Sequence, residues 1–393
     1  MRNAFLVDYA RSAFSRAHPV KMDVDPFADM RADEILADIM KNICQRNDIT
    51  NDLIDDLTIG CALPVKDQWS FGGRYPIYLS GLGGKGGSRM IDQQCGSGLA
   101  AMRMAALNIG AGSAHIALAA GYEHMTRIPM GPSLFKEGVL TVPSKGYDGE
   151  RKLDMGVALN MGLTAERLAA ESGIGRQAMD EFAYHSHQKA GQAQKVGFFA
   201  NEIIPITTPN GQTVQVDGNI RQDTTLSRLA ELKPVFDEEG IVSAGNSSPL
   251  TTGAALSVLM SEEAILKTRA EPVARIVSCV DRGVNPELMG AGVMPAIEAA
   301  LENAGITSDQ VSAWEINEAF SVVPLYAMKQ LKLDPEKVNI MGGAIALGHP
   351  LGATGIRLTG TLARILRKID GRYGVAAACI GGGQGIAMVI EKV

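Results

Sequence analysis

Cys95 combines a reactive side chain with an unusual local sequence. It stands in the stretch DQQCGSGLAAMRMAALNIGAG, directly before glycines and a long run of small and apolar residues. Gly96 and Gly98 permit a sharp turn from a strand into a helix, and the N-terminus of a helix lowers the pKa of a nearby thiol. The pattern predicts a nucleophilic thiolate, although a buried structural cysteine beside a tight turn fits this stretch equally well.

His349 lies in a second glycine-rich loop, GGAIALGHPLGATG. Gly348 before it and Pro350 after it restrict the backbone path. A single histidine usually has a structural role, but this loop occupies the place in the second half of the chain that the Cys95 loop occupies in the first. If the halves pack face to face, the thiol and the imidazole meet as a nucleophile and its base.

Two further motifs place reactive or polar groups at the ends of apolar strands. Cys379 lies in AAACIGGGQGIAMVIEKV, where one strand leads into the glycines and another leads out. The glycines therefore form a hairpin tip, since a phosphate-binding loop needs a helix after them. Asn317 and Glu318 of NEAF end a buried strand and need partners: they either orient a water or a histidine, or tie loops together.

The elements that position these residues follow an α/β pattern that occurs twice. Short apolar runs alternate with segments of helical spacing, which indicates a largely buried sheet covered by helices. Residues 49–61, ITNDLIDDLTIGC, align without gaps with residues 306–318, ITSDQVSAWEINE. Each segment is followed by a glycine-rich loop, a helix and a small-residue strand, so the sequence predicts a duplicated α/β domain.

The duplication divides the chain into segments. Residues 1–121 form the first half, and residues 271–393 form the second. Residues 122–248 are polar and rich in loops, with two predicted helices, and form an insertion over the core. Residues 249–270 are again rich in small and apolar residues, as expected for a core segment, and complete the first half. Insertions of this kind often carry ligand contacts.

Composition excludes several classes of protein. The net charge is −6 with no basic stripe, which argues against a nucleic-acid partner, and no apolar run approaches the ~20 residues of a membrane span. The 5 cysteines include no CxxC pair, so neither zinc nor a disulfide framework is expected. His185 and His187 lie two apart on a predicted helix and cannot share a metal. Free thiols without a secretory signal predict a cytoplasmic protein.

Together these motifs resemble the thiolase family, and the resemblance spans essentially the whole chain. Its carriers are QQCGSGLAAMRMA, AGNSSPLTTGAA, NEAF, GGAIALGHPLGATG and CIGGGQG. The resemblance implies a duplicated fold in five layers, α-β-α-β-α, with an inserted loop domain. It also implies reversible Claisen chemistry on coenzyme A thioesters, with coenzyme A as a co-substrate and no permanently bound cofactor.

The resemblance further implies a role for each motif. His349 takes the proton of Cys95, Cys95 attacks the 3-keto carbon of a 3-ketoacyl-CoA, and Cys379 protonates the departing acetyl-CoA carbanion. A water held by Asn317 would help His349 to stabilise an enolate, and the backbone of Cys95 and Gly381 would bind the oxyanion. The resemblance also implies that six residues contact the acyl chain or coenzyme A: Met161, Arg221, Ser248, Met289, Ala319 and Phe320.

Within this resemblance the substrate has alternatives. Family members specialised for acetoacetyl-CoA often carry a histidine where this chain has Asn160, which favours the degradative 3-ketoacyl-CoA thiolases of fatty-acid β-oxidation. The alternatives are an acetoacetyl-CoA thiolase, a carrier-protein-dependent ketoacyl synthase, and a non-catalytic acyl-CoA-binding subunit. The family also implies a homodimer or homotetramer, with a β-oxidation enzyme as a further candidate partner.

Overall fold

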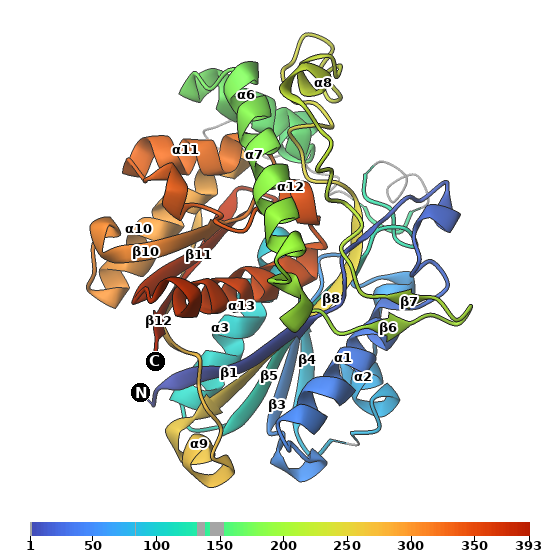
Figure 1. Cartoon of the computed structure of the whole chain (residues 1–393), viewed down its shortest axis with the longest axis vertical. Coiled ribbons are helices and arrows are strands. Elements are labelled where there is room, and N and C mark those ends of the chain that lie inside the picture. The colour runs from blue at the N-terminus through green and yellow to red at the C-terminus, as the bar shows by residue number, and fades with distance from the viewer. Residues whose placement is uncertain (1, 83, 132–137, 142–152) are drawn as a thin grey trace.

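The two halves predicted from the sequence form similarly ordered strands in this computed structural model, which describes residues 2–82, 84–131, 138–141 and 153–393 (Figure 1). In the first half the strands lie in the order β4-β3-β5-β8-β1. Their bounds are Ala4–Arg11 (β1), Asp56–Gly60 (β3), Gly87–Ile91 (β4), Ile116–His124 (β5) and Thr251–Ser261 (β8). β3 runs parallel to β4 and β5, while β8 is antiparallel to β5 and β1. The short β2 (Ser15–Arg16) also pairs with β8.

The second half repeats this order as β10-β11-β12-β9. The strands are Ala274–Gly283 (β9), Val311–Ile316 (β10), Tyr373–Ile380 (β11) and Gln384–Lys392 (β12). Val338 forms a parallel bridge with Trp314 of β10, which is the place that β4 takes beside β3. The predicted duplication is therefore confirmed. The two sheets are also joined, since Phe5 and Leu6 of β1 pair with β9 at its start.

Helices separate and cover the two sheets. α1 (Ala32–Arg46) and α2 (Arg74–Leu79) lie on the outer face of the first sheet. α3 (Ser97–Gly110) and α13 (Leu351–Ile369) pack on each other between the sheets, and α13 contacts strands of both. α10 (Val293–Ala304) covers the second sheet with α11 (Val322–Leu331) beside it. The predicted five-layered arrangement is confirmed (Figure 1).

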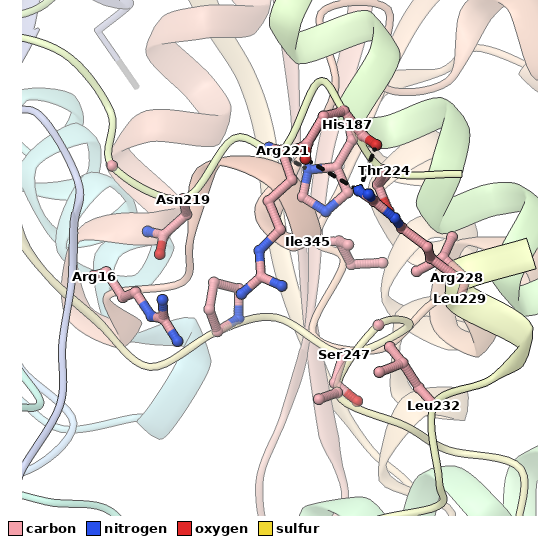
Figure 2. A pocket seen from close by; sticks show the side chains of 15 residues that line it. Arg16, His187, Asn219, Arg221, Thr224, Arg228, Leu229, Leu232, Ser247 and Ile345 are labelled. Atoms are coloured by element: carbon pink, nitrogen blue, oxygen red, sulfur yellow. Dashed lines mark hydrogen bonds and ion pairs between the residues drawn. The ribbon is translucent and has the colours of Figure 1, made fainter. Parts of the chain in front are cut away.

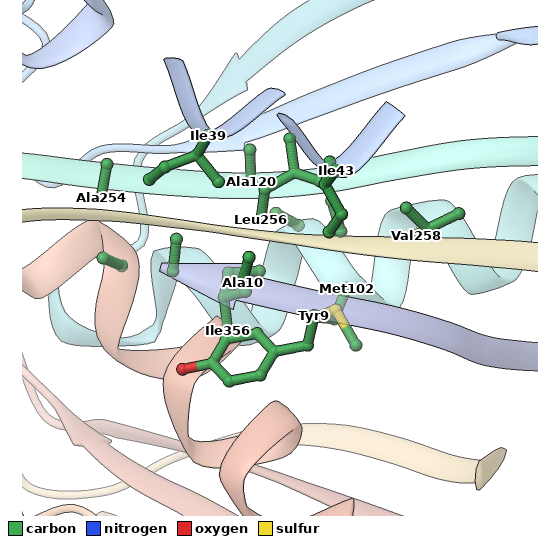
Figure 3. Close-up of a cluster of buried hydrophobic side chains, with 14 of the residues drawn as sticks. Tyr9, Ala10, Ile39, Ile43, Met102, Ala120, Ala254, Leu256, Val258 and Ile356 are labelled. Carbon is green, nitrogen blue, oxygen red and sulfur yellow. The ribbon is translucent and has the colours of Figure 1, made fainter. Parts of the chain in front are cut away.

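Burial on both faces explains the near-continuous apolar strands. Every residue of β3, β5 and β8 is buried, as expected for strands covered by helices on both sides. Figure 3 shows Ile39 and Ile43 of α1 on one side of the first sheet, with Met102 of α3 and Ile356 of α13 on the other.

Glycines let the three innermost elements meet at the N-termini of α3 and α13. A Cβ added at Gly121 of β5 would lie 1.9 Å from the carbonyl oxygen of Gly352, and one added at Gly98 would lie 2.6 Å from the same oxygen. Real Cβ atoms do not approach this closely, so only glycine fits at both positions. The loops that carry Cys95 and His349 precede these helices, so this crossing brings the two loops together.

The predicted insertion at residues 122–248 overlaps the last three residues of β5 and ends before β8. Residues 132–137 and 142–152 of it lie outside the described residues. Its other elements are α5 (Met155–Ala158), α6 (Met161–Ser172), α7 (Arg176–Lys195), α8 (Leu226–Ala230) and a hairpin of β6 (Ile206–Thr207) and β7 (Thr213–Val214). Buried Arg11 anchors it to β1 through Glu202 at 2.8 Å and Asp217 at 2.6 Å. The segment boundaries stay predictions.

Two further short α-helices lie outside the predicted insertion. α9 (Glu262–Thr268) follows β8, and α12 (Ala344–Leu347) packs on α7 just before the His349 loop. No helix within the described ranges is both long and apolar enough to cross a membrane.

Candidate active site

Cys95 lies at the start of α3, as the glycine pattern predicts. A single 3-10 turn, Gln94–Gly96, leads directly into the helix, and Gln94 adopts a left-handed backbone with φ of 46°. The turn is held by Asp92, which accepts from the Gln94 N–H at 3.0 Å, and by Ser97, which donates to the Gln94 carbonyl at 2.7 Å. The Cys95 side chain is 8% exposed. The strand-to-helix turn therefore presents the thiol inside the molecule.

The acidity of the Cys95 thiol differs from the sequence prediction. Burial raises the pKa of Cys95 to about 12, and a hydrogen bond from the Gly381 backbone offsets only part of this rise. The prediction that the helix N-terminus leaves Cys95 with a lowered pKa is wrong for the free protein. The free energy lost when the thiolate is removed from water exceeds the stabilisation that nearby N–H groups provide. The thiol consequently needs a base in order to ionise.

Cys379 lies at the end of β11, where β11 and β12 form the predicted hairpin. Cys379 is opposite Gly385, and Gly382 and Gly383 at the tip have φ of 85° and 78°. Burial and the neighbouring Cys95 raise the pKa of the Cys379 thiol. The two thiols therefore lie close enough to interact electrostatically, and burial favours the protonated form of both.

His349 stands between α12 and α13 with both ring nitrogens partnered. Its Nδ1 lies 2.6 Å from the Thr354 hydroxyl, which donates to the Pro350 carbonyl at 3.0 Å. Its Nε2 lies 3.2 Å from the Asn317 side-chain nitrogen. Because the threonine proton is used on the carbonyl and the amide nitrogen can only donate, Nδ1 carries the ring proton and Nε2 accepts. Nε2 is thus the unprotonated ring nitrogen, and it can act as a base once it releases the Asn317 N–H.

Asn317 and Glu318 have different roles. The Asn317 side chain contacts His349, and its buried Oδ1 has no hydrogen-bond partner in the described structure. Glu318 instead accepts from Ser186 at 2.6 Å, from Asn339 at 2.7 Å and from the Ile345 N–H at 3.0 Å. Asn317 thus offers an open acceptor beside the histidine, whereas Glu318 ties loops together.

Burial of His349 predicts a pH dependence of stability. Burial, with a smaller contribution from Arg357, lowers the pKa of His349 from 6.5 to about 3. Below about pH 6.5 the unfolded chain therefore binds a proton that the folded protein excludes, so stability is complete above that pH and falls on acidification. One such group costs about 1.4 kcal/mol per pH unit.

We expect the free energy of unfolding, measured by denaturant titration, to fall between pH 6.5 and 4. The fall should be shallower in His349→Gln. Burial also lowers the pKa of His187 to about 4, so His187→Gln is the matched control and should lose a similar slope. Equal slopes in wild type and His349→Gln would contradict a neutral buried His349.

A cavity of about 430 Å³ opens beside this cluster, between α7, α8 and the loop that precedes β8 (Figure 2). Arg16, Arg221 and Arg228 line it. Arg228 pairs with Asp223 at 3.1 Å, but Arg16 and Arg221 form no ion pair within the described part of the chain. The cavity therefore presents unpaired positive charge to a ligand.

Asn219 connects the cavity to the histidine loop. Its side-chain nitrogen donates to the Leu347 carbonyl at 3.2 Å, and a Cβ added at Gly348 would lie 2.8 Å from that nitrogen. Cys95 does not line the cavity. The cavity thus adjoins the cluster of Cys95, Cys379 and His349 without containing it, an arrangement that suits a long ligand whose far end extends beyond the cavity.

The six predicted ligand contacts are distributed around this region. Arg221 lines the cavity, and the Ser248 N–H donates to the Ala319 carbonyl at 2.9 Å. Phe320 packs edge to face on Phe236 at 5.9 Å between ring centroids. The remaining two are Met161 and Met289. The Met161 sulfur lies beside Gly381, whereas Met289 is 1% exposed in the same apolar cluster as Phe320 and does not line the cavity.

Sequence reasoning missed four residues that the structure places here. His187 was considered only as a metal ligand, yet its Nδ1 accepts from the Arg221 N–H at 3.2 Å on the cavity wall. Asn219 carries no sequence signal, because its partner Leu347 is 128 residues away. Thr354 had a signal, since it lies in the GGAIALGHPLGATG motif five residues after His349. Glu123 also had a sequence signal, because it is an acidic residue at the end of the largely apolar run HIALAAGYE. No group of three or more potential metal ligands gathers in the described ranges.

Comparisons with known proteins find relatives along the whole chain. Residues 6–263 match the thiolase N-terminal domain, and residues 270–392 match the thiolase C-terminal domain. The chain is 37% identical to a 3-ketoacyl-CoA thiolase of Saccharophagus degradans over 100% of this chain and 99% of the relative. It is 38% identical to a β-ketoadipyl-CoA thiolase of Acinetobacter baylyi over 100% of each. The crystal structure of human mitochondrial 3-ketoacyl-CoA thiolase with CoA is 33% identical, with a TM-score of 0.88 over 100% of this chain and 98% of that one.

Proposed function

Since this chain belongs to the thiolase family, we propose that it cleaves 3-ketoacyl-CoA with coenzyme A, releasing acetyl-CoA and an acyl-CoA shortened by two carbons. The chain is thus an acyltransferase. The observation that carries the proposal is the convergence of Cys95, Cys379 and the paired His349 and Asn317 where the two halves meet. We propose β-oxidation of fatty acids as its setting.

The first half-reaction forms an acyl-enzyme. His349 Nε2 takes the Cys95 proton, and the thiolate attacks the 3-keto carbon while the backbone N–H groups of Cys95 and Gly381 bind the resulting oxyanion. The bond between C2 and C3 then breaks, and its electron pair stays on C2 of the departing acetyl-CoA. Cys379, protonated because burial raises its pKa, donates its proton to that carbon.

The second half-reaction transfers the acyl group. Coenzyme A enters, gives its thiol proton to the Cys379 thiolate, and attacks the thioester carbon on Cys95. The Cys95 thiolate leaves and recovers its proton from His349. Every group returns to its starting state, so the kinetics are expected to be ping-pong.

Arg221 is proposed to bind the nucleotide end of coenzyme A, because it is an unpaired cation in the cavity next to the histidine loop. In Arg221→Ala we expect the KM for coenzyme A to rise about tenfold with kcat nearly unchanged, since one charge-assisted contact to phosphate is worth roughly 1.5 kcal/mol or more. Steady-state kinetics with varied coenzyme A measure this. A pantetheine substrate without the nucleotide should show no difference from wild type, and an equal loss with it would contradict the assignment.

The acyl range is tested by a panel of 3-ketoacyl-CoA substrates. The relatives named 3-ketoacyl-CoA thiolase favour broad-chain cleavage over an acetoacetyl-CoA thiolase or a non-catalytic subunit. Asn160 supports this, because its side chain caps α6 by accepting from the Gly162 and Leu163 N–H groups and no histidine is present there. We expect turnover of both C4 and C8 substrates. Turnover of C4 alone would indicate an acetoacetyl-CoA thiolase.

We propose a homodimer or homotetramer in the cytoplasm. β4 is an outer strand of the first sheet and leaves backbone groups free along one edge, which supports association, and the cysteines of the described structure are unpaired thiols. Sedimentation equilibrium gives the assembly, and a monomer at micromolar concentration would contradict it. Co-purification with other β-oxidation enzymes tests for a partner subunit.

A further inference from the structure

Glu123 is a buried carboxylate that the proposed reaction does not use. It lies near the end of β5 and is 1% exposed. Its Oε2 accepts from the N–H groups of Ala62 and Gly352, each at 3.0 Å. Its Oε1 accepts from the Leu63 N–H at 3.3 Å and from the Gln68 side chain at 2.8 Å. One side chain therefore links the loop after β3, in the first half, to the start of α13 in the second.

These four donors favour the ionised form of the Glu123 carboxyl. No lysine, arginine or histidine forms an ion pair with Glu123 in the described structure, so its charge is balanced by N–H dipoles alone. One of these belongs to Gly352 in the first turn of α13, where the helix dipole favours a negative charge. Burial raises the pKa of Glu123, while the hydrogen bonds from Ala62 and Gln68 lower it.

The bonded peptides form part of the wall of the catalytic cluster. Ala62 and Leu351, the residue before Gly352, pack with Cys95 in one small apolar cluster. His349 stands two residues before Leu351, and its Nδ1 partner Thr354 lies in the first turns of α13. A shift of α13 against the β3 loop would consequently displace the imidazole relative to the thiol.

We propose, on the basis of the thiolase reaction above, that Glu123 is a positioning residue whose carboxylate locks the β3 loop to α13 and so holds Cys95 and His349 in reactive geometry. Its two oxygens suit this task, because each carboxylate oxygen accepts two hydrogen bonds. A glutamine there would aim an NH₂ group at N–H donors and break the link to one of the two halves.

The same charge also acts on Cys95. The negative Glu123 raises the pKa of the Cys95 thiol. The other titratable groups that face Glu123 are Cys61, whose thiol lies 3.6 Å from Oε1, and Tyr122. Neither carries positive charge. Removal of the Glu123 charge should therefore make the thiolate easier to form while the reaction slows. A general loss of structure would also expose the thiol and lower its pKa, so the two changes count only in a variant whose circular dichroism spectrum matches that of wild type.

The test compares Glu123→Gln, Glu123→Asp and a control, Asp25→Asn. Asp25 is also a buried acid bonded by side-chain hydroxyls and a backbone N–H, so its substitution reports the general cost of losing a buried carboxylate. For Glu123→Gln we expect kcat to fall about a hundredfold with little change in the KM for coenzyme A. The pH midpoint of Cys95 alkylation by iodoacetamide should fall by about half a unit or more.

Glu123→Asp keeps the charge but shortens the reach, so kcat should fall while the alkylation midpoint stays near that of wild type. Asp25→Asn should leave the midpoint unchanged. Full kcat in Glu123→Gln, or an unshifted midpoint with a loss no larger than in Asp25→Asn, would overturn the proposal. The alkylation arm needs no substrate, so it separates failure of this inference from failure of the proposed reaction. If Glu123→Gln does not fold, the Glu123→Asp kinetics decide.

Discussion

Replacement of Cys95 by alanine is expected to lower the rate of 3-ketoacyl-CoA thiolysis by about 10⁴-fold or more. Between the two half-reactions the acyl group is bonded to the Cys95 sulfur. Water cannot replace the thiol in this role, because a hydrolysed acyl group is not transferred to coenzyme A. Removal of the thiol leaves His349 and Asn317 in place, so any residual rate would report binding and polarisation without covalent catalysis. Steady-state turnover measures the loss, and intact-protein mass spectrometry measures the adduct.

The adduct experiment separates loss of the nucleophile from loss of the fold. Wild type mixed with acetyl-CoA should gain one acetyl group, and Cys95→Ala should gain none. Cys279 on β9 is a partly exposed thiol outside the site, so Cys279→Ala should acetylate as wild type does. Turnover that survives in Cys95→Ala with an intact circular dichroism spectrum would refute covalent catalysis.

Replacement of Cys379 by alanine is expected to lower the rate of carbon–carbon bond cleavage and formation by about 10³-fold. The α-carbon of acetyl-CoA is a very weak acid. Each proton transfer to or from this carbon therefore needs a positioned acid or base. The thiol of coenzyme A, in contrast, ionises near pH 8.5 without help. Acylation of Cys95 by acetyl-CoA should therefore fall much less than the complete reaction.

Exchange of labelled coenzyme A into acetyl-CoA isolates the acylation step. This exchange uses Cys95 but makes no carbon–carbon bond. We expect Cys379→Ala to retain exchange within about tenfold of wild type while thiolysis and condensation fall together. Cys379→Ser restores the volume of the side chain without its acidity, and it should behave like the alanine variant. Equal losses in exchange and thiolysis would contradict the acid–base role.

Several features of this protein were predictable because they depend on residues close together in the chain. The repeat of residues 49–61 in 306–318 predicted strands at β3 and β10, and both are present. The glycines after Cys95 predicted a turn into a helix, and those after Cys379 predicted a hairpin. Periodicity and turn chemistry are local, so spacing alone carries this information.

Other features depend on groups that meet only after folding. The pKa of Cys95 was predicted to fall, and burial instead raises it to about 12, because desolvation depends on everything that surrounds the sulfur. The unprotonated state of His349 Nε2 follows from partners at residues 317 and 354. Glu123 binds peptides 61 residues before it and 229 residues after it.

The sequence by itself therefore determined the duplicated framework, the position of each reactive residue on it, and the family. The tertiary structure alone decided the protonation of the thiols, the tautomer of the imidazole, the unpaired arginines of the cavity, and the carboxylate that joins the two halves. The physical reason is range: backbone preferences act over a few residues, whereas desolvation and hydrogen bonding act between any groups that the fold brings within a few ångströms.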